Sequence, residues 1–210
     1  ARLLTEWSSV RIRPAALLIF KCGELEKIVR RIKDEFAVLP ADTLYSLSIG
    51  VFSNKAEEIY RIKGRGKEIP IPIGVLDKNM MEEYVEVNSK VIKILNNDWS
   101  YLVTFILWNK NIPKTIVGEK VGVRIPKNDI LKNVMKVVGP ITLTSANKHG
   151  GKNPITINDA YEELGDLVNI YLDCGPCLGI PSTVVDLTGD KPILIREGAI
   201  PFTKIVDLYG

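Results

Sequence analysis

The chain has 210 residues, of which 46% are hydrophobic, and this is enough for one domain with a sizeable buried core. Its 28 Lys+Arg stand against 25 Asp+Glu, and the resulting net charge of +3 is too weak to argue for nucleic-acid binding by itself. No stretch approaches the roughly 20 apolar residues of a membrane span, and the apolar run near the N-terminus is too short for a signal peptide.

The first half of the chain mixes helical and extended patterns. Residues 1–16 show no clear periodicity and are expected to form an N-terminal extension, and residues 17–210 are expected to form one domain. The elements expected in chain order are a helix over 24–36, a short buried strand over 37–40, a helix over 53–63 with Ser53 or Asn54 as its N-cap, an extended segment over 69–76 that contains Pro70 and Pro72, and helical patterning in two pieces over 79–97.

The second half is richer in strands. The expected elements are an interior strand over 101–108, a strand over 120–126, a helix over 128–138, a strand over 139–145, a short helix over 157–164 capped by Asn158, strands over 168–173, 182–187 and 192–197, and a closing helix over 201–209. The strands and helices do not alternate strictly. This order favours a single α/β domain with a twisted mixed (parallel and antiparallel) sheet flanked by helices.

The segment Cys174-Gly-Pro-Cys177 resembles a thiol–disulfide exchange motif. Such a motif normally opens a helix that lowers the thiol pKa, but Gly179 and Pro181 follow here and predict a loop and then a strand. A zinc site lacks a second cysteine pair, and the only histidine is His149. We therefore interpret the two cysteines as part of a tight turn, and three cysteines in all suit a reducing cytosol.

Two polar loops have the spacing of an anion-binding site. The loop "KGRGKEIP" places Lys63 and Arg65 two residues apart, so that they share a face in extended backbone. The loop "TSANKHGG" ends a strand with Ser145 and Asn147 and continues into a glycine pair, whose backbone N–H groups can hold phosphate oxygens. The alternative is that the cations are solvated charges at a helix end and that the second loop is an ordinary turn.

Four further segments carry polar side chains on or next to strands. These are "PADTLYSL" with Thr43, "PSTVVD" with Ser182, and two otherwise apolar strands, "VRIP" with Arg124 and "LIREG" with Arg196. Either arginine alone could be a structural ion-pair partner. Polar groups that follow five separate strands favour a concave site built by loops on a rigid scaffold.

Six motifs in this order resemble the YrdC family of threonylcarbamoyl-AMP synthases, some of which are described as double-stranded-RNA-binding proteins. The motifs are "PADTLY", "KGR", "VGVRIP", "SAN", "PSTVVD" and "LIREG". The resemblance runs from about Leu17 to the C-terminus. It implies a single α/β domain with a positively charged cavity, and the reaction of L-threonine, bicarbonate and ATP to threonylcarbamoyl-AMP and pyrophosphate, which feeds the threonylcarbamoyladenosine modification of tRNA.

The resemblance also implies roles for individual residues. Its catalytic set falls on Lys63, Arg65, Ser145 and Asn147. The L-threonine positions fall on Thr43, Arg124, Ser145 and Ser182, and the nucleotide positions fall on Lys63, Arg65, Asn147, Thr156 and Arg196. ATP is implied as a substrate that carries its own Mg²⁺, and no dedicated metal site is expected.

This chain departs from the family pattern at five positions near the expected substrates, namely Ala41, Ser46, Ile69, Gly74 and Lys120. In some members a histidine that contacts threonine stands where this chain has Gly74. A relative that acts on another amino acid is therefore one alternative. A second is a double-stranded-RNA-binding module without catalysis, and a third is a thiol oxidoreductase that uses Cys174 and Cys177. The expected partners are tRNA and the proteins that transfer the threonylcarbamoyl group, in the cytoplasm and without a membrane.

Overall fold

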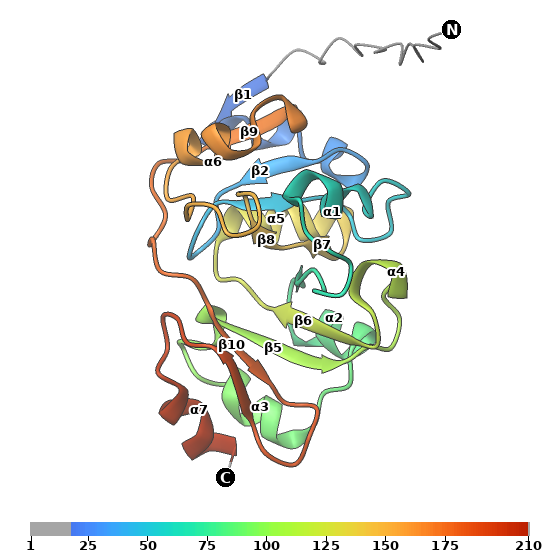
Figure 1. Ribbon diagram of the computed structural model, residues 1–210, viewed down its shortest axis with the longest axis vertical. Coiled ribbons are helices and arrows are strands. Elements are labelled where there is room, and N and C mark those ends of the chain that lie inside the picture. The colour runs from blue at the N-terminus through green and yellow to red at the C-terminus, as the bar shows by residue number, and fades with distance from the viewer. Residues whose placement is uncertain (1–17, 210) are drawn as a thin grey trace, which may run out of the picture.

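The strands of the computed structural model, which describes residues 18–209, form two sheets where one was expected (Figure 1). The first sheet has the order β1 (Leu18–Lys21), β9 (Ile170–Asp173), β2 (Ala37–Leu39), β3 (Ser46–Ser48) and β8 (Thr144–Ser145). The second has the order β11 (Ile193–Arg196), β10 (Thr183–Asp186), β5 (Val103–Trp108), β6 (Lys120–Arg124), β4 (Ile73–Gly74) and β7 (Ile141–Thr142). Each sheet contains parallel and antiparallel pairs, which confirms the mixed α/β class. The expected extension over residues 1–16 lies outside the described residues.

The helices are short. They are α1 (Glu58–Lys63), α2 (Lys78–Tyr84), α3 (Ser89–Leu95), α4 (Lys114–Val117), α5 (Asp129–Val138), α6 (Ile157–Leu164) and α7 (Phe202–Tyr209). Figure 1 shows α6 beside the first sheet and α3 next to α7 at the opposite end of the molecule. None of the helices within residues 18–209 has the length and hydrophobicity that a membrane crossing requires.

The segment expected to be one helix over 24–36 is instead two 3₁₀ turns, Cys22–Lys27 and Arg31–Lys33. Its apolar side chains are buried or half-buried, as the periodicity predicts, and Ile28 and Ile32 are fully inaccessible. The segment joins β1 to β2, which lie on either side of β9 in the same sheet. Its two ends are thereby fixed, so tertiary packing overrides the helical pattern.

Two helix starts differ from the sequence prediction. Helix α1 begins at Glu58, four residues or more after Ser53 and Asn54, and turns fill the residues between. Helix α6 is capped by Thr156 rather than by Asn158. The Thr156 hydroxyl accepts a hydrogen bond from the Asp159 N–H at 3.2 Å, and the Asp159 carboxylate accepts one from the Thr156 N–H at 2.8 Å. This reciprocal capping box satisfies two backbone donors at once.

The strand expected over 139–145 is divided between the two sheets. β7 pairs with β4 in the second sheet, and β8 pairs with β3 in the first. The chain crosses from one sheet to the other at Leu143, whose N–H donates to the Pro72 carbonyl at 2.8 Å. The "TSAN" loop is thus held between the sheets.

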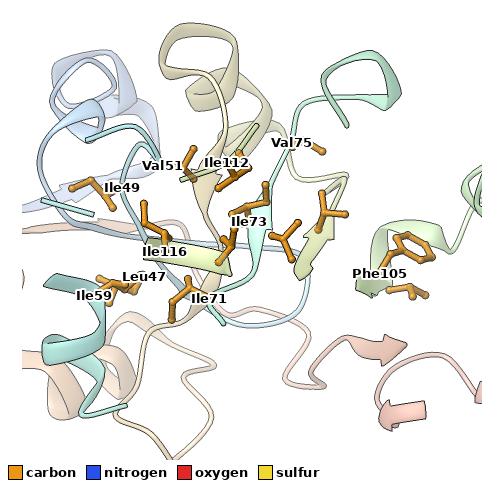
Figure 2. Close-up of a cluster of buried hydrophobic side chains, with 14 of the residues drawn as sticks. Leu47, Ile49, Val51, Ile59, Ile71, Ile73, Val75, Phe105, Ile112 and Ile116 are labelled. Atoms are coloured by element: carbon orange, nitrogen blue, oxygen red, sulfur yellow. The ribbon is translucent and has the colours of Figure 1, made fainter. Parts of the chain in front are cut away.

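The main core joins the two sheets. Figure 2 shows part of this cluster, in which Leu47 of the first sheet and Ile73 and Phe105 of the second are fully or almost fully buried. Strand β5 lies between β10 and β6, which confirms the predicted interior strand. Its alternate residues Thr104 and Ile106 point to the other face and line a cavity.

The structure places the cysteines differently from the expected pattern. Cys174 forms a disulfide with Cys22, the residue directly after β1, and not with Cys177. Cys177 is a free, half-buried thiol, and burial raises its pKa. The turn itself is held by Tyr45, whose hydroxyl donates to the Gly175 carbonyl at 2.8 Å. A buried thiol with a raised pKa is a poor nucleophile, which argues against the oxidoreductase alternative.

Candidate active site

A cavity of about 770 Å³ is lined by residues of both sheets. Eight of the nine predicted site residues line it, namely Thr43, Lys63, Arg65, Arg124, Ser145, Asn147, Ser182 and Arg196. These residues come from loops and strand ends that are far apart in the sequence. The tertiary structure therefore brings together the polar groups that the sequence places after separate strands.

Lys63 is the last residue of α1, and Gly64 ends the helix with a positive φ of 58°, a conformation that favours glycine. The Lys63 side chain turns inward and only 2% of the residue is exposed. Its ammonium donates to the carbonyls of Ser145 at 2.6 Å and Asn147 at 2.7 Å. Burial, with a further contribution from the charge of Arg65, lowers the pKa of Lys63 to about 7.

The "SAN" turn is held by its own side chains as well as by Lys63. The Ser145 hydroxyl donates to the Asn147 side-chain oxygen at 2.6 Å, and the Asn147 amide donates to the Gly151 carbonyl at 3.0 Å. Asn147 is 6% exposed and Ser145 is half-buried. The turn is thereby rigid before any ligand binds, which is the condition for positioning an anion.

Arg65 adds a second cation at the same end of the cavity. One of its terminal nitrogens donates to the Pro70 carbonyl at 3.0 Å. Its Nε is buried and has no hydrogen-bond partner within residues 18–209. Burial lowers the pKa of Arg65, and the charge of Arg196 acts in the same direction. The Lys63 ammonium faces three acceptors of the turn, including the Asn147 side-chain oxygen at 3.4 Å, so Lys63 contributes mainly its charge. Its charge together with the guanidinium of Arg65 makes this end suited to a polyphosphate.

A second polar group surrounds Arg124 on β6. Its guanidinium donates to the Thr43 hydroxyl at 2.9 Å and to the Asp42 carboxylate at 3.1 Å. The Arg124 and Asp42 side chains are 6% and 8% exposed. The Arg124 Nε is buried without a partner among the described residues and is shielded from the cavity. Each terminal nitrogen has a second N–H that the bonds to Thr43 and Asp42 do not use, so the guanidinium retains donors for an incoming carboxylate.

Asp42 does not line the cavity, but it pairs with Arg124 and is a supporting residue that the sequence prediction did not include. It lies next to Thr43 in the "PADTLY" loop, and its carboxylate also accepts the Lys127 N–H at 3.2 Å. Burial lowers the pKa of Arg124, and the charge of Asp42 opposes this. The sequence contained only a weak signal, namely an acidic residue next to Thr43, which was itself a predicted substrate-binding residue.

We expect Asp42→Asn to raise the KM for the substrate carboxylate about tenfold and to destabilise the fold by about 3 kcal/mol, because it leaves a buried cation without its counter-charge. The KM for the polyphosphate substrate expected at Lys63 and Arg65 should stay within about twofold of the native value. Steady-state kinetics and denaturant unfolding check the two effects. Asp42→Glu restores the charge and should recover most of the affinity, and an equal loss for both substrates would contradict this role.

Ser182 and Arg196 form a third group at the second sheet. The Ser182 hydroxyl lies 2.9 Å from the Thr104 hydroxyl, and Arg196 donates to the Ser182 carbonyl at 2.9 Å. Thr104 also lines the cavity and was not predicted, because it sits inside an apolar strand. Burial lowers the pKa of Arg196. These groups continue the polar lining of the cavity from Arg124 of β6 to β5, β10 and β11 of the same sheet.

Thr156 is the one predicted site residue that does not line the cavity. Its hydroxyl donates to the Asp159 carboxylate at 2.8 Å and accepts from the Asp159 N–H, so it is occupied by the cap of α6. It lies at the end of the loop that runs from the Ser145–Asn147 turn to α6. Its role in nucleotide binding stays a prediction.

We expect Thr156→Ala to lower the free energy of unfolding by about 1 kcal/mol, the usual loss for an N-cap. Thr156→Ser keeps the hydroxyl and should retain the stability of the native chain. Urea denaturation measures this effect, and the KM for the nucleotide, measured in parallel, should change by less than about twofold. A large rise in that KM with unchanged stability would instead assign Thr156 to the nucleotide.

Four of the five residues that depart from the family pattern line the cavity: Ala41, Ser46, Ile69 and Lys120. Lys120 is paired with Asp186 at 3.0 Å on the floor of the cavity. Gly74 is buried behind the wall and does not itself line the cavity. The departures therefore lie around the site and leave the groups at Lys63 and Arg124 intact.

Comparisons with known proteins agree with this geometry. The Sua5/YciO/YrdC family model, described as telomere recombination, matches residues 32–198. A Methanocaldococcus jannaschii protein provisionally named threonylcarbamoyl-AMP synthase is 35% identical over 190 residues, which cover 87% of this chain and 91% of that protein.

Two solved structures have the same fold. The crystal structure of Pyrococcus abyssi Sua5 complexed with L-threonine matches with a TM-score of 0.81 at 24% identity. The match covers 93% of this chain but 61% of that one, so this chain spans only part of the length of that protein. Escherichia coli YciO matches with a TM-score of 0.82 at 23% identity, covering 90% of this chain and 99% of that one.

Proposed function

Because the chain belongs to the Sua5/YciO/YrdC family, we propose that it is an L-threonylcarbamoyladenylate synthase, an enzyme that makes threonylcarbamoyl-AMP and pyrophosphate from L-threonine, bicarbonate and ATP. One observation carries the proposal. A single cavity holds two distinct hydrogen-bonded groups, one around Lys63 and Arg65 and one around Arg124 and Thr43. The first suits a polyphosphate and the second suits an amino-acid carboxylate.

In this proposal the nucleotide phosphates lie against Lys63, Arg65, Ser145 and Asn147. Lys63 is fixed by two backbone carbonyls, and its position costs no reorganisation when the substrate arrives. Arg196 extends the nucleotide site from β11. ATP would bring its own Mg²⁺, which would neutralise part of the phosphate charge.

The amino acid lies against Arg124, Thr43, Ser145 and Ser182. Arg124 takes the carboxylate with the donors that Asp42 and Thr43 leave free. This leaves the threonine amine directed into the cavity, toward the phosphate end. There the amine combines with bicarbonate to give a carbamate and water.

The bond-forming step is the attack of the carbamate oxygen on the α-phosphorus, with pyrophosphate as the leaving group. Two anions must approach each other, so the cations Lys63 and Arg65 lower the barrier by neutralising charge, and the fixed turn positions the phosphate. The step needs neither a nucleophilic cysteine nor a catalytic histidine, and the only histidine, His149, lies at the exposed rim of the cavity.

Pyrophosphate release tests the proposal. With ATP and Mg²⁺ present, release should require both L-threonine and bicarbonate, and mass spectrometry should detect threonylcarbamoyl-AMP. Omitting bicarbonate or using D-threonine provides the controls. Pyrophosphate release that is independent of any amino acid would overturn the proposal.

The wider setting follows from the product. Threonylcarbamoyl-AMP is a reactive mixed anhydride, and we infer that transfer proteins use it in the cytoplasm to modify tRNA. We also infer that residues 17–210 act as one domain. The RNA-binding alternative is not favoured, because the relatives are named as synthases and the net charge is only +3.

A further inference from the structure

Leu143 occupies a special place beside the amino-acid site. It is the residue at which the chain passes from β7 in one sheet to β8 in the other. It is 8% exposed and lines the cavity, while its side chain belongs to a buried apolar cluster with Met135. Its exposed edge is therefore a wall of the cavity, fixed from behind by the core.

The space that Leu143 fills is created by Gly74. A Cβ atom at position 74 would lie 3.1 Å from the Leu143 Cδ2 and 3.5 Å from the Met135 Sδ. The first distance is tighter than an ordinary van der Waals contact, so a side chain at position 74 would require Leu143 to shift by a few tenths of an ångström. Leu143 thus covers the backbone at Gly74.

This position is next to Arg124. Gly74 of β4 is the direct partner of Arg124 in the parallel ladder between β4 and β6. Ala41, which also lines the cavity and is 6% exposed, belongs to the same apolar cluster as Leu143 and lies two residues before Thr43. The polar pair of Arg124 and Thr43 is therefore flanked by an apolar wall of Ala41 and Leu143.

We propose that Leu143 is a specificity-determining residue for the amino-acid substrate, and this inference rests on the proposed function. When the substrate carboxylate is bound to Arg124, the side chain on the neighbouring α-carbon reaches the wall, and the methyl group of threonine packs against Leu143. Serine lacks this methyl group and loses the contact. A methyl or methylene group in an apolar pocket discriminates by roughly 10- to 200-fold.

The test compares kcat/KM for L-threonine and L-serine within one enzyme preparation, so that the fraction of folded protein cancels. We expect the native chain to prefer threonine about tenfold or more, and Leu143→Ala to reduce this ratio by about tenfold while it improves turnover of larger aliphatic amino acids. Leu131→Ala is the matched control, because Leu131 is a buried leucine of the same cluster that does not line the cavity. It should leave the ratio unchanged.

A second variant tests the same wall without removing Leu143. Gly74→Ala places a methyl group against Leu143 and should push it toward the substrate, lowering kcat/KM more for threonine than for serine. A threonine-to-serine ratio that stays native in both variants, or that changes as much in Leu131→Ala, would overturn the inference while leaving the proposed function intact. If no amino acid supports pyrophosphate release in the native chain, the proposed function itself fails.

Discussion

Replacing Lys63 by alanine is expected to lower kcat about 10³-fold, the usual effect of removing a fixed group that stabilises charge in the transition state. Lys63 is buried and is held by the Ser145 and Asn147 carbonyls, so no other side chain can take its position. Amino-acid-dependent pyrophosphate release measures the loss. The matched control is Lys67→Ala four residues on, because Lys67 is 64% exposed and pairs with Glu57. It should retain near-native activity.

The variant should also fold. Removal of Lys63 deletes a buried charge whose desolvation is costly, but it also leaves the Ser145 and Asn147 carbonyls without their donor. Circular dichroism should therefore show native structure, with a loss of about 1–3 kcal/mol in the free energy of unfolding. Lys63→Ala with wild-type turnover would mean that the phosphate site lies elsewhere.

The lowered pKa of Lys63 predicts a pH dependence. In the free enzyme the pKa is about 7, so the ammonium that binds phosphate is lost as the pH rises above that value. The kcat/KM for ATP should therefore fall above about pH 7, by up to about tenfold per pH unit. Bound phosphates favour the charged form, so kcat should hold to higher pH. Lys63→Arg keeps its charge and should flatten the profile; a native profile in that variant would assign the titration to another group.

The lowered pKa of Lys63 also makes the stability of the fold depend on pH, in the direction opposite to that of ATP binding. Lys63 has a lowered pKa in the folded state, whereas an unfolded lysine titrates near about 10.4. Between the two values the unfolded chain binds more protons than the folded one, so the free energy of unfolding rises with pH in this window. Binding of ATP and stability should therefore respond to alkaline pH in opposite ways.

Replacing Arg65 by alanine is the second substitution with a large expected effect, a loss in kcat/KM for ATP of about 10²- to 10³-fold. The Arg65 Nε is buried and has no partner within residues 18–209, and one terminal nitrogen is anchored to Pro70. The guanidinium is thus held in place at the cavity wall, and its other terminal nitrogen is left to donate to a ligand. Arg65→Lys keeps a charge but loses the planar fork, and should recover only part of the activity.

Arg61 of α1, four residues before Arg65, provides the control. Its side chain is 69% exposed and pairs with Glu58 at 3.2 Å, an interaction that contributes little to stability. Arg61→Ala should keep both the activity and the KM for ATP. A similar loss in Arg61→Ala and Arg65→Ala would point to a general electrostatic effect and would remove Arg65 from the active site.

Much of the secondary structure followed from local pattern. The apolar run of β5, the amphipathic helix α5 and the two helical pieces over 79–97 appear where periodicity predicts them. The errors fall where tertiary contacts overrule a local signal. The apolar stripe over 24–36 is buried, yet the chain there is tied at both ends to one sheet and forms 3₁₀ turns. The single strand expected over 139–145 is split because its halves pair in different sheets.

The site was predictable in residue type and not in arrangement. Motif order selected Lys63, Arg65 and Arg124 as candidate site residues, and all three line the cavity. Asp42 was missed, since its role depends on Arg124, which lies 82 residues away in the chain. Thr156 was assigned from its position in the family pattern, while its hydroxyl is occupied by a helix cap.

The α/β class, the candidate polar residues and the family resemblance follow from local periodicity and motif spacing. The bond between Cys174 and Cys22, the cavity between two sheets, and the packing of Leu143 over Gly74 beside Arg124 depend on the folded chain. These features are contacts between residues far apart in the chain, and no local propensity encodes them. They arise when burial of the apolar faces brings the two sheets together.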